Sequence, residues 1–281
     1  MMRSFSAAVS GLRAHQTYLD TVANDIANVN TLAYKSSRFN FKDAFNQTLR
    51  NADGAGTTLG SVNGQQVGLG VEVGSIDNQM GQGPVTATGN PFDMALQGDG
   101  FFRLTDSATA PYTSLSYTRA GNFSLDENGF MINPDGFYLV GYAVTAGPPP
   151  APNTATEQRI QVPTTARSVN IDQNGLVAYI DAAGVTQYAG YVSLAKFPNS
   201  AGLERVSANR WTDSQASGTP TNDIANQNGI GSITSRALEM SNVDLAFEFS
   251  EMIKAQRGYQ VNARTITTAD EMLQTLTQMK R

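Results

Sequence analysis

The sequence predicts an α+β fold in which an antiparallel β-rich central domain is joined to α-helices at both ends of the chain. Two observations predict it: both ends repeat apolar residues every seven positions, and the middle alternates apolar with polar residues between Asn-Gly turns. We expect residues 1–29 and 238–281 to form a terminal coiled-coil-like helical domain. Residues 30–69 should be an extended linker segment, and residues 70–237 the β-rich domain.

The N-terminal repeat predicts a helix from Ser4 to Val29. One line of its apolar seam, spaced by seven, is Phe5, Leu12, Leu19 and Ile26. The second line follows three residues later, at Ala8, His15, Val22 and Val29. These are the a and d positions of a coiled coil.

The C-terminal repeat predicts a longer helix, from Asn242 to Lys280, with Ser241 as N-cap and Asp244 completing a capping box. Its first seam line is Leu245, Met252, Tyr259, Ile266 and Leu273, and its second is Ala255, Asn262, Ala269 and Leu276. Because this helix is about half as long again as the first, part of its seam must face something other than its partner.

The middle of the chain is typical of short strands joined by tight turns. Asp126–Gly129 and Asp172–Gly175 both read Asp-x-Asn-Gly between alternating segments, which predicts hairpins because Asn-Gly accepts positive φ. Residues 134–136 and 181–184 are weaker turns of the same kind. We expect about ten short antiparallel strands.

Composition excludes several classes of function. Cysteine is absent, so the chain cannot hold a disulfide framework, a thiol nucleophile or a cysteine metal site. Residues 51–237 hold eight Lys or Arg against fifteen Asp or Glu, which is too acidic for nucleic-acid binding. No apolar run is long enough to span a membrane. The first residues do not resemble a cleavable secretory signal, so we expect export by a route without one.

The search for catalytic chemistry gives no positive signal. His15 is the single histidine and lies on a helical seam, which excludes a two-histidine metal site and favours a packing role. Asp126, Asn128 and Asp135 do not have the spacing of a calcium loop, and the Gly-x-Gly segments do not open a helix after a strand. A carboxylate pair for glycoside hydrolysis is not excluded, although turns explain the carboxylates. We expect no metal, no cofactor and no enzyme activity.

Three segments, in order, resemble the bacterial flagellar axial proteins, the rod and hook family. They are "SAAVSGLRAHQTYLDTVANDIANVNTLAYKSSRFNFKDAF", "GNPFDMALQGDGFFRL" with "YTRAGNFSLDENGFMINPDGFYLVGY", and "LEMSNVDLAFEFSEMIKAQRGYQVNARTITTADEMLQTL". Where many hook proteins carry a large outer domain, this chain has only "GPPPAPNTATEQ". The chain is most similar to a short hook protein, and the alternative is the distal rod subunit.

The resemblance implies a structural subunit that polymerises with itself into a helical tube, flexible if it is the hook joining rod to filament. Its further partners would be adjacent axial proteins (rod, hook cap and hook–filament junction) and the flagellar type III export apparatus. It implies a location in the flagellum, in the hook or basal body, extracellular after export. It also implies terminal helices that fold on assembly and line the inside of the tube, with no membrane insertion and no nucleic acid.

The assembly interface is expected on the terminal helices. Asn24 and Asn28 are four residues apart and share one helical face, which could bond to a neighbouring subunit or could be an ordinary polar face at a helix end. The candidate residues are Phe5, Leu12, Leu19, Val22, Asn24, Ile26, Asn28, Leu245, Met252, Tyr259, Asn262, Ile266, Leu273 and Leu276.

Two other functions compete with the polymer subunit. An enzyme acting on cell-wall glycan would need a carboxylate pair in a cleft. A surface-binding module would lay its N-terminal helix on a membrane. That helix has only Arg3 and Arg13 before Asp20 and no tryptophan, so the signal for membrane binding is weak.

Overall fold

The computed structural model describes residues 2–54, 61–110, 112, 114–145 and 150–279. The chain divides into two compact units. The helical unit contains residues 1–29, 36–79 and 243–281, and the β unit contains residues 30–35 and 80–242. The α+β fold with helices at both ends of a β-rich centre is confirmed.

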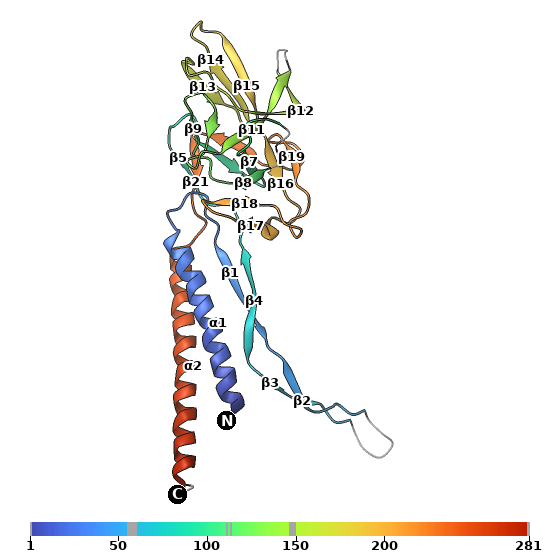
Figure 1. Cartoon of the computed structure of the whole chain (residues 1–281), viewed down its shortest axis with the longest axis vertical. Helices are drawn as coiled ribbons and strands as arrows, with labels where there is room; N and C mark the ends of the chain where they lie inside the picture. The colour runs from blue at the N-terminus through green and yellow to red at the C-terminus, as the bar shows by residue number, and fades with distance from the viewer. Residues whose placement is uncertain (1, 55–60, 111, 113, 146–149, 280–281) are drawn as a thin grey trace. The chain divides into compact units, whose positions relative to one another are not determined.

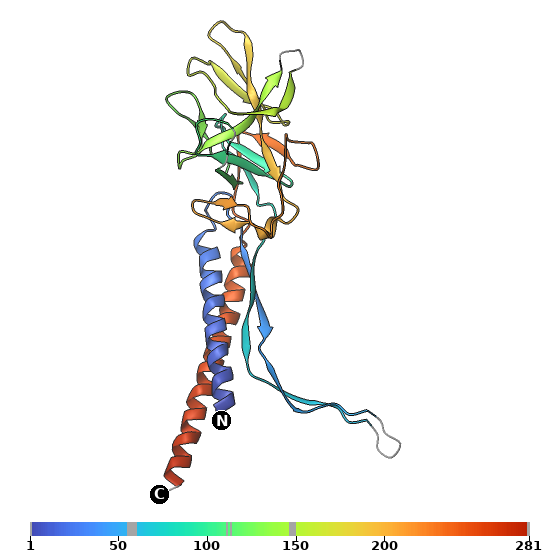
Figure 2. The same ribbon diagram turned by 45° about the vertical axis from the view of Figure 1, so that its right-hand side comes forward.

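The helical unit consists of two long antiparallel helices and two pairs of strands. Its elements are α1 (Met2–Ala27), β1 (Ser37–Asp43), β2 (Asn46–Arg50), β3 (Gln65–Gly68), β4 (Val71–Asn78) and α2 (Leu245–Met279). In Figures 1 and 2 the helices lie side by side, and the two ends of the chain lie at the same end of the pair. At the usual rise, α1 is about 39 Å long and α2 about 52 Å.

The start of α2 differs from the expectation. The helix begins at Leu245, and Asp244 is its N-cap: one carboxylate oxygen accepts hydrogen bonds from the backbone N–H of Ala246 at 2.9 Å and of Phe247 at 3.4 Å. Ser241 is therefore not the cap. Asp244 is a better cap than Ser241 because its charged carboxylate also interacts favourably with the helix dipole.

Residues 36–79 were expected to be mostly linker, yet they belong to the helical unit. β1 pairs with β4 from Ser37 opposite Asn78 to Asp43 opposite Val71, and β2 pairs with β3. We call residues 36–79 the arm. The backbone N–H of Val71 donates to Ser10 Oγ of α1 at 3.3 Å, so the start of β4 is fixed on the first helix. The pairing is long-range, and few residues of the arm are buried, which left a weak pattern in the sequence.

The β unit contains seventeen described strands, more than the ten expected, because many are only two to four residues long. The strands are β5 (Val85–Ala87), β6 (Met94–Gln97), β7 (Phe101–Thr105), β8 (Leu115–Thr118), β9 (Ser124–Leu125), β10 (Met131–Ile132), β11 (Tyr138–Thr145), β12 (Ala151–Arg159), β13 (Ser168–Ile171), β14 (Leu176–Ile180), β15 (Thr186–Val192), β16 (Leu194–Lys196), β17 (Glu204–Arg205), β18 (Arg210–Thr212), β19 (Thr221–Asp223), β20 (Ser232–Ser235) and β21 (Ala237–Glu239). A 3-10 turn, η1, covers Ser200–Gly202. The main sheet runs β13-β14-β15-β11-β7-β8-β18-β17, all antiparallel.

The predicted turns are present. Gly129 and Gly175 have φ of +79° and +81°, and each donates its N–H to the carbonyl of the aspartate three residues earlier. Only the glycine of each Asn-Gly pair has positive φ, so these are type I turns followed by a glycine bulge rather than type I′ turns.

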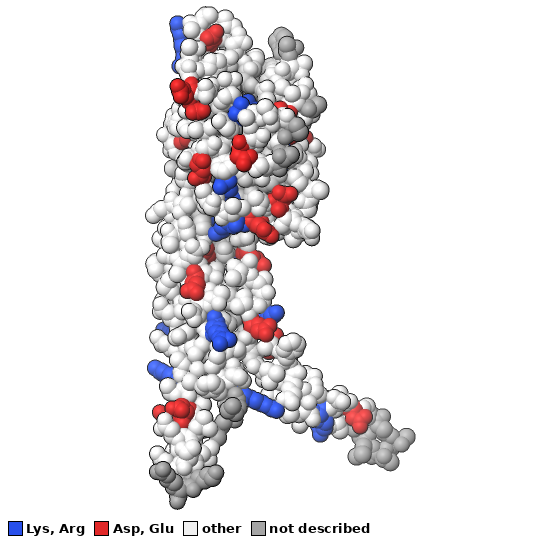
Figure 3. Space-filling model, viewed as in Figure 1, with Lys and Arg blue, Asp and Glu red and all other residues white. Residues whose placement is uncertain are grey.

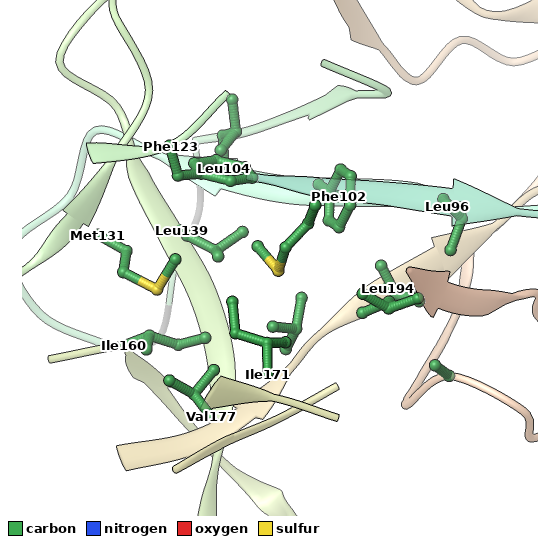
Figure 4. Close-up of a cluster of buried hydrophobic side chains, with 14 of the residues drawn as sticks. Leu96, Phe102, Leu104, Phe123, Met131, Leu139, Ile160, Ile171, Val177 and Leu194 are labelled. Carbon is green, nitrogen blue, oxygen red and sulfur yellow. The ribbon is translucent and has the colours of Figure 1, made fainter. Parts of the chain in front are cut away.

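The core of the β unit is built mainly from side chains of β6, β7, β11 and β16 and of the strands beside them. Figure 4 shows Phe102 and Leu104 of β7 facing Leu139 of β11 and Leu194 of β16, and all four side chains are fully buried. A second cluster contains Phe101, Tyr117, Phe197 and Trp211, the single tryptophan. Burying each such side chain stabilises a fold by about 1.5–3 kcal/mol, so this unit has a conventional core of large residues.

Candidate assembly interface

The line of contact between α1 and α2 is made of small and polar residues. A Cβ built on Gly11 would lie 2.8 Å from Asn262 Nδ2, and one built on Gly258 would lie 2.4 Å from His15 Cε1. Nearer the C-terminus of α1, the hydroxyl of Tyr18 donates to Glu251. The buried apolar residues of the pair are Ala8, Ala14, Val22, Ala255 and Ala269. Small side chains let the two helix backbones approach closely.

The seam is therefore rotated from the one predicted. Ala8 and Val22 of the second predicted line are buried, with His15 against α2, as expected. The first line is less buried: Phe5 is 45% exposed and Leu12, Leu19 and Ile26 are half-buried. A different line spaced by seven lies against α2 or is buried beside it: Gly11 lies against Asn262, Tyr18 donates to Glu251, and Asp25 is fully buried. Large side chains do not fit between backbones that approach as closely as these do at Gly11 and Gly258.

The same holds for α2. Asn262, Met252 and Ile266 are half-buried, whereas Leu245 and Tyr259 are exposed. Leu273 and Leu276 are 41% and 49% exposed. Continuing the observed register places the first residue of α1 level with about residue 271 of α2, so the last turns of α2 extend past α1. Every described residue from 270 to 279 is exposed.

Exposed apolar side chains gather on the helical unit. Of 23 large apolar side chains exposed among the described residues, 19 belong to the helical unit, including Phe45 at 82% and Val261 at 62%. Only Ile180, Val185, Tyr188 and Val206 belong to the larger β unit. Contiguous exposed apolar surface marks a site of association, and the unequal distribution points to the helical unit.

The amide pair near the end of α1 bonds within its own helix. Asn28 Nδ2 donates to the Asn24 carbonyl at 2.9 Å and to Asn24 Oδ1 at 3.2 Å. Asn24 is exposed and Asn28 is half-buried. The pair thus supports the C-terminal end of α1, and a role in contacts between subunits stays a prediction.

Carboxylates cluster where the C-terminal end of α1 meets the start of α2. Asp25 is fully buried and accepts a hydrogen bond from the backbone N–H of Ser37 at 3.0 Å. Glu248 is buried nearby. Burial, and then the negative charges of Asp25, Glu251 and Asp244, raise the pKa of Glu248 to about 7. Burial and the hydrogen bond to Glu251 raise the pKa of Tyr18, so the phenol stays a donor.

The aromatic side chains of β1 cover the outer side of this contact. Phe39 and Phe41 lie 4.7 Å apart between ring centroids, Tyr18 stacks on Phe39 at 5.2 Å, and His15 lies 5.2 Å from Phe41. Burial lowers the pKa of His15, so the imidazole is neutral at pH 7. His15 therefore packs between α2 and β1, which agrees with the packing role expected from the sequence.

A buried ion cluster in the β unit was not foreseen. Lys35 Nζ lies 2.6 Å from Glu239 Oε1, Arg119 Nη1 lies 3.5 Å from Glu239 Oε2, and all three side chains are at most 4% exposed. Lys35 also donates to the Gly81 carbonyl at 2.8 Å, and the Gly83 N–H donates to Glu239 Oε1 at 2.9 Å. The cluster fixes the chain just after α1 and just before α2 to the same point of the β unit. The signal that could have pointed to it is that each of the three segments resembling the axial proteins contains one of these charged residues.

The distribution of charge, of metal-binding side chains and of hydropathy bears on the other functions considered. In Figure 3 acidic and basic side chains are scattered over the face shown. Within the described ranges no group of three or more His, Cys, Asp or Glu residues could hold a metal ion. Among the described helices, none has the length and hydropathy needed to cross a membrane.

Comparison with known proteins agrees with this arrangement. Residues 5–35 match the family model "Flagella basal body rod protein", residues 95–179 match "Flagellar hook protein FlgE/F/G D1 domain", and residues 234–279 match "Flagellar basal body rod FlgEFG protein C-terminal". The flagellar basal-body rod protein FlgG of Bacillus subtilis is 42% identical over 285 residues, covering both chains fully.

The chain belongs to the flagellar rod and hook protein family. FlgG of Caulobacter vibrioides is 34% identical over 99% of this chain and all of that protein. The flagellar hook protein FlgE of Borreliella burgdorferi is 27% identical, also with full coverage of both chains. The predicted family is confirmed, and so is the expectation that the chain is a structural subunit rather than an enzyme. Lys35, Arg119 and Glu239 come one each from the three matched segments.

The choice between hook and rod shifts with these comparisons. The hook was favoured from the sequence, but three rod proteins, FlgG of Bacillus subtilis, of Caulobacter vibrioides and of Buchnera aphidicola subsp. Acyrthosiphon pisum, are 34–42% identical over at least 99% of this chain. The alignment with the hook protein extends over 446 positions, against 285 for the first rod protein. That hook protein therefore carries long additional segments that this chain lacks.

Proposed function

We propose that the chain is a subunit of the distal rod of the flagellar basal body. The observation that carries the proposal is the full-length match to rod proteins with almost no insertions, beside the long insertions of the hook relative. A hook subunit is the expectation from the sequence, and the near absence of insertions relative to the rod proteins favours the rod instead.

The proposed subunit polymerises with itself through the helical unit. Its exposed apolar residues are not covered by the described part of the same chain, and association of copies would exclude water from them. Each Leu that becomes fully buried stabilises the association by about 1.5–3 kcal/mol, and every subunit repeats the gain. The interface comprises the half-buried and exposed members of the predicted set, from Phe5 to Leu276.

The β unit would form the wall of the polymer, because it has a complete core and few exposed apolar residues. Adjacent axial proteins would bind the two ends of the polymer. Export through the flagellar type III apparatus would bring the subunit across the inner membrane, and its place would be in the flagellum outside the cytoplasm.

Electron cryotomography of cells lacking the gene tests the choice of rod over hook. We expect basal bodies whose rod stops short, with no hook attached, and complete rods again when the gene is restored. Basal bodies with a complete rod that lack only the hook would show that the chain is a hook subunit instead. An intact rod and hook would reject both assignments.

A further inference from the structure

A groove runs along α1 on the side turned away from α2. Phe5, Val9 and Arg13 of α1 line it together with Val71, Glu72 and Val73 of β4, and its volume is about 560 Å³. Phe5 is 45% exposed and Val73 is 36% exposed. The groove is therefore apolar, open to water, and built wholly within the helical unit.

Among the described residues, nothing packs over the end of α2: every residue from 270 to 279 is exposed. Met272, Leu273, Leu276 and Met279 share one face and are all at least 41% exposed. Gln274 and Gln278 lie on the opposite face. Asp270 and Glu271 flank the apolar stripe at its start. The segment has the pattern of a helix that binds in an apolar groove through residues spaced by three and four.

The groove and this segment do not meet within one chain. α2 packs on the face of α1 that carries Ala8, Gly11 and His15, whereas Val9 and Arg13 point to another face of the helix. By the register of the pair, residues 272–279 have already passed the first residue of α1. If this segment binds in the groove, it must come from a second chain.

We propose that the groove between α1 and β4 receives residues 270–279 of α2 from a second copy of this chain. The inference rests on the proposed polymer and names its contact. Opposite charges support it: Arg13 is the cation of the groove, Asp270 and Glu271 are the anions of the segment, and Glu72 of the groove is already paired with Lys42 at 3.4 Å.

The geometry of such a contact gives an open polymer. Each copy has both the groove and the helix end, and the two are different surfaces. An interface between different surfaces that does not close into a ring produces a helical filament. One end of the filament then presents empty grooves and the other presents bare helix ends, so each end is ready for a different axial protein.

Disulfide cross-linking tests this contact, because the native chain has no cysteine. Two forms of the gene are expressed together in cells lacking the original, one with Ser6→Cys or Val9→Cys in the groove and the other with Leu273→Cys or Leu276→Cys. Basal bodies are isolated and oxidised with copper–phenanthroline. We expect a cross-linked dimer at a yield several-fold above that with Gln274→Cys, the matched control on the opposite face of the segment.

The outcomes separate the contact from the polymer. If the variants are incorporated into rods and the Leu and Gln positions cross-link equally or not at all, the contact is wrong and the rod function stands. If the chain is absent from isolated basal bodies, the proposed function fails and the contact fails with it. As a second measurement, Asp270→Asn with Glu271→Gln should lower the cross-linking yield at low salt. An unchanged yield would show that attraction between Arg13 and these carboxylates does not contribute to the contact.

Discussion

Lys35 Nζ lies 2.6 Å from Glu239 Oε1, and both side chains are completely buried. The two residues are separated by most of the chain, and each lies a few residues from one of the terminal helices. Arg119 is the third member and adds a second positive charge beside the single carboxylate. Burial lowers the pKa of Lys35, and the charge of Glu239 opposes that change. One anion therefore holds two buried cations.

This arrangement predicts unequal effects of substitution. Glu239→Gln leaves Lys35 and Arg119 buried without a counter-charge, and should destabilise the β unit by about 3–5 kcal/mol. Lys35→Met leaves Glu239 with Arg119 and mainly costs the hydrogen bond to Gly81, about 1–3 kcal/mol. Urea unfolding followed by the fluorescence of Trp211, the single tryptophan, measures both. Equal effects would show that the charges do not act as a cluster.

The same cluster predicts an unusual pattern of proteolysis. Lys35 is fully buried, whereas the side chain of Arg38, three residues later, is 62% exposed. Brief treatment with trypsin should cut after Arg38 and leave the bond after Lys35 intact. The peptide that carries residues 30–35 should stay bound to the fragment 80–242, because Arg205 donates to the Lys35 carbonyl at 2.7 Å and Asn209 to the Leu32 carbonyl at 2.7 Å. Mass spectrometry of the purified core reads both results, and early cleavage after Lys35 would contradict the structure.

Gly258 should tolerate no side chain while His15 is present. Gly258→Ala raises helix propensity by about 1 kcal/mol, yet the added Cβ would lie 2.4 Å from the His15 ring. We expect lower helix content and weaker assembly. His15→Ala combined with Gly258→Ala should restore the pairing in part, because the ring is gone. Circular dichroism at 222 nm on the three variants is the measurement, and a Gly258→Ala protein as helical as the wild type would contradict close packing here.

Acidity should favour the helix pair. The pKa of Glu248 is raised from 4.5 in the unfolded chain to about 7 in the fold, so the folded state holds a proton that the unfolded state has lost. Stability from this group is complete below pH 4.5 and is lost as the pH rises through 7, by as much as about 3 kcal/mol. Helix content of the wild type should fall as the pH rises from about 4.5 to just above 7.

Glu248→Gln is the control for that titration. It removes the carboxyl, and the fall in helix content between about pH 4.5 and 7 should largely disappear. His15 acts in the opposite sense, because burial lowers its pKa and its contribution is lost as the pH falls. The difference between wild type and Glu248→Gln isolates the carboxyl, and identical pH profiles would exclude it.

Local features of the fold were predictable from the sequence and long-range ones were not. The glycine turns at Gly129 and Gly175 depend on a few neighbouring residues, so the pattern was sufficient. The helix seam was rotated because hydrophobic spacing ranks Phe5 and Leu12 above Gly11, while close packing selects the glycine. The arm of residues 36–79 was missed because its strands pair over long separations.

The candidate interface was predictable only in outline. The helices were identified, and so was the unpartnered end of α2, because the two helices differ in length. The groove between α1 and β4 could not be predicted, since it needs the position of a strand whose exposed face has no hydrophobic pattern. The ion cluster joins Lys35, Arg119 and Glu239 across most of the chain, and no spacing rule connects them.

Removing residues 270–281 tests most directly the claim that the helical unit assembles the polymer. The truncated chain should keep the urea midpoint of Trp211 fluorescence, because the β unit is complete without the segment. It should still be exported, but should appear as monomer in the medium and leave the cells immotile. A full-length control with Gln274→Ser and Thr277→Ser, on the polar face of the same turns, should assemble normally. If the truncated protein built normal rods, the exposed end of α2 would not be part of the interface.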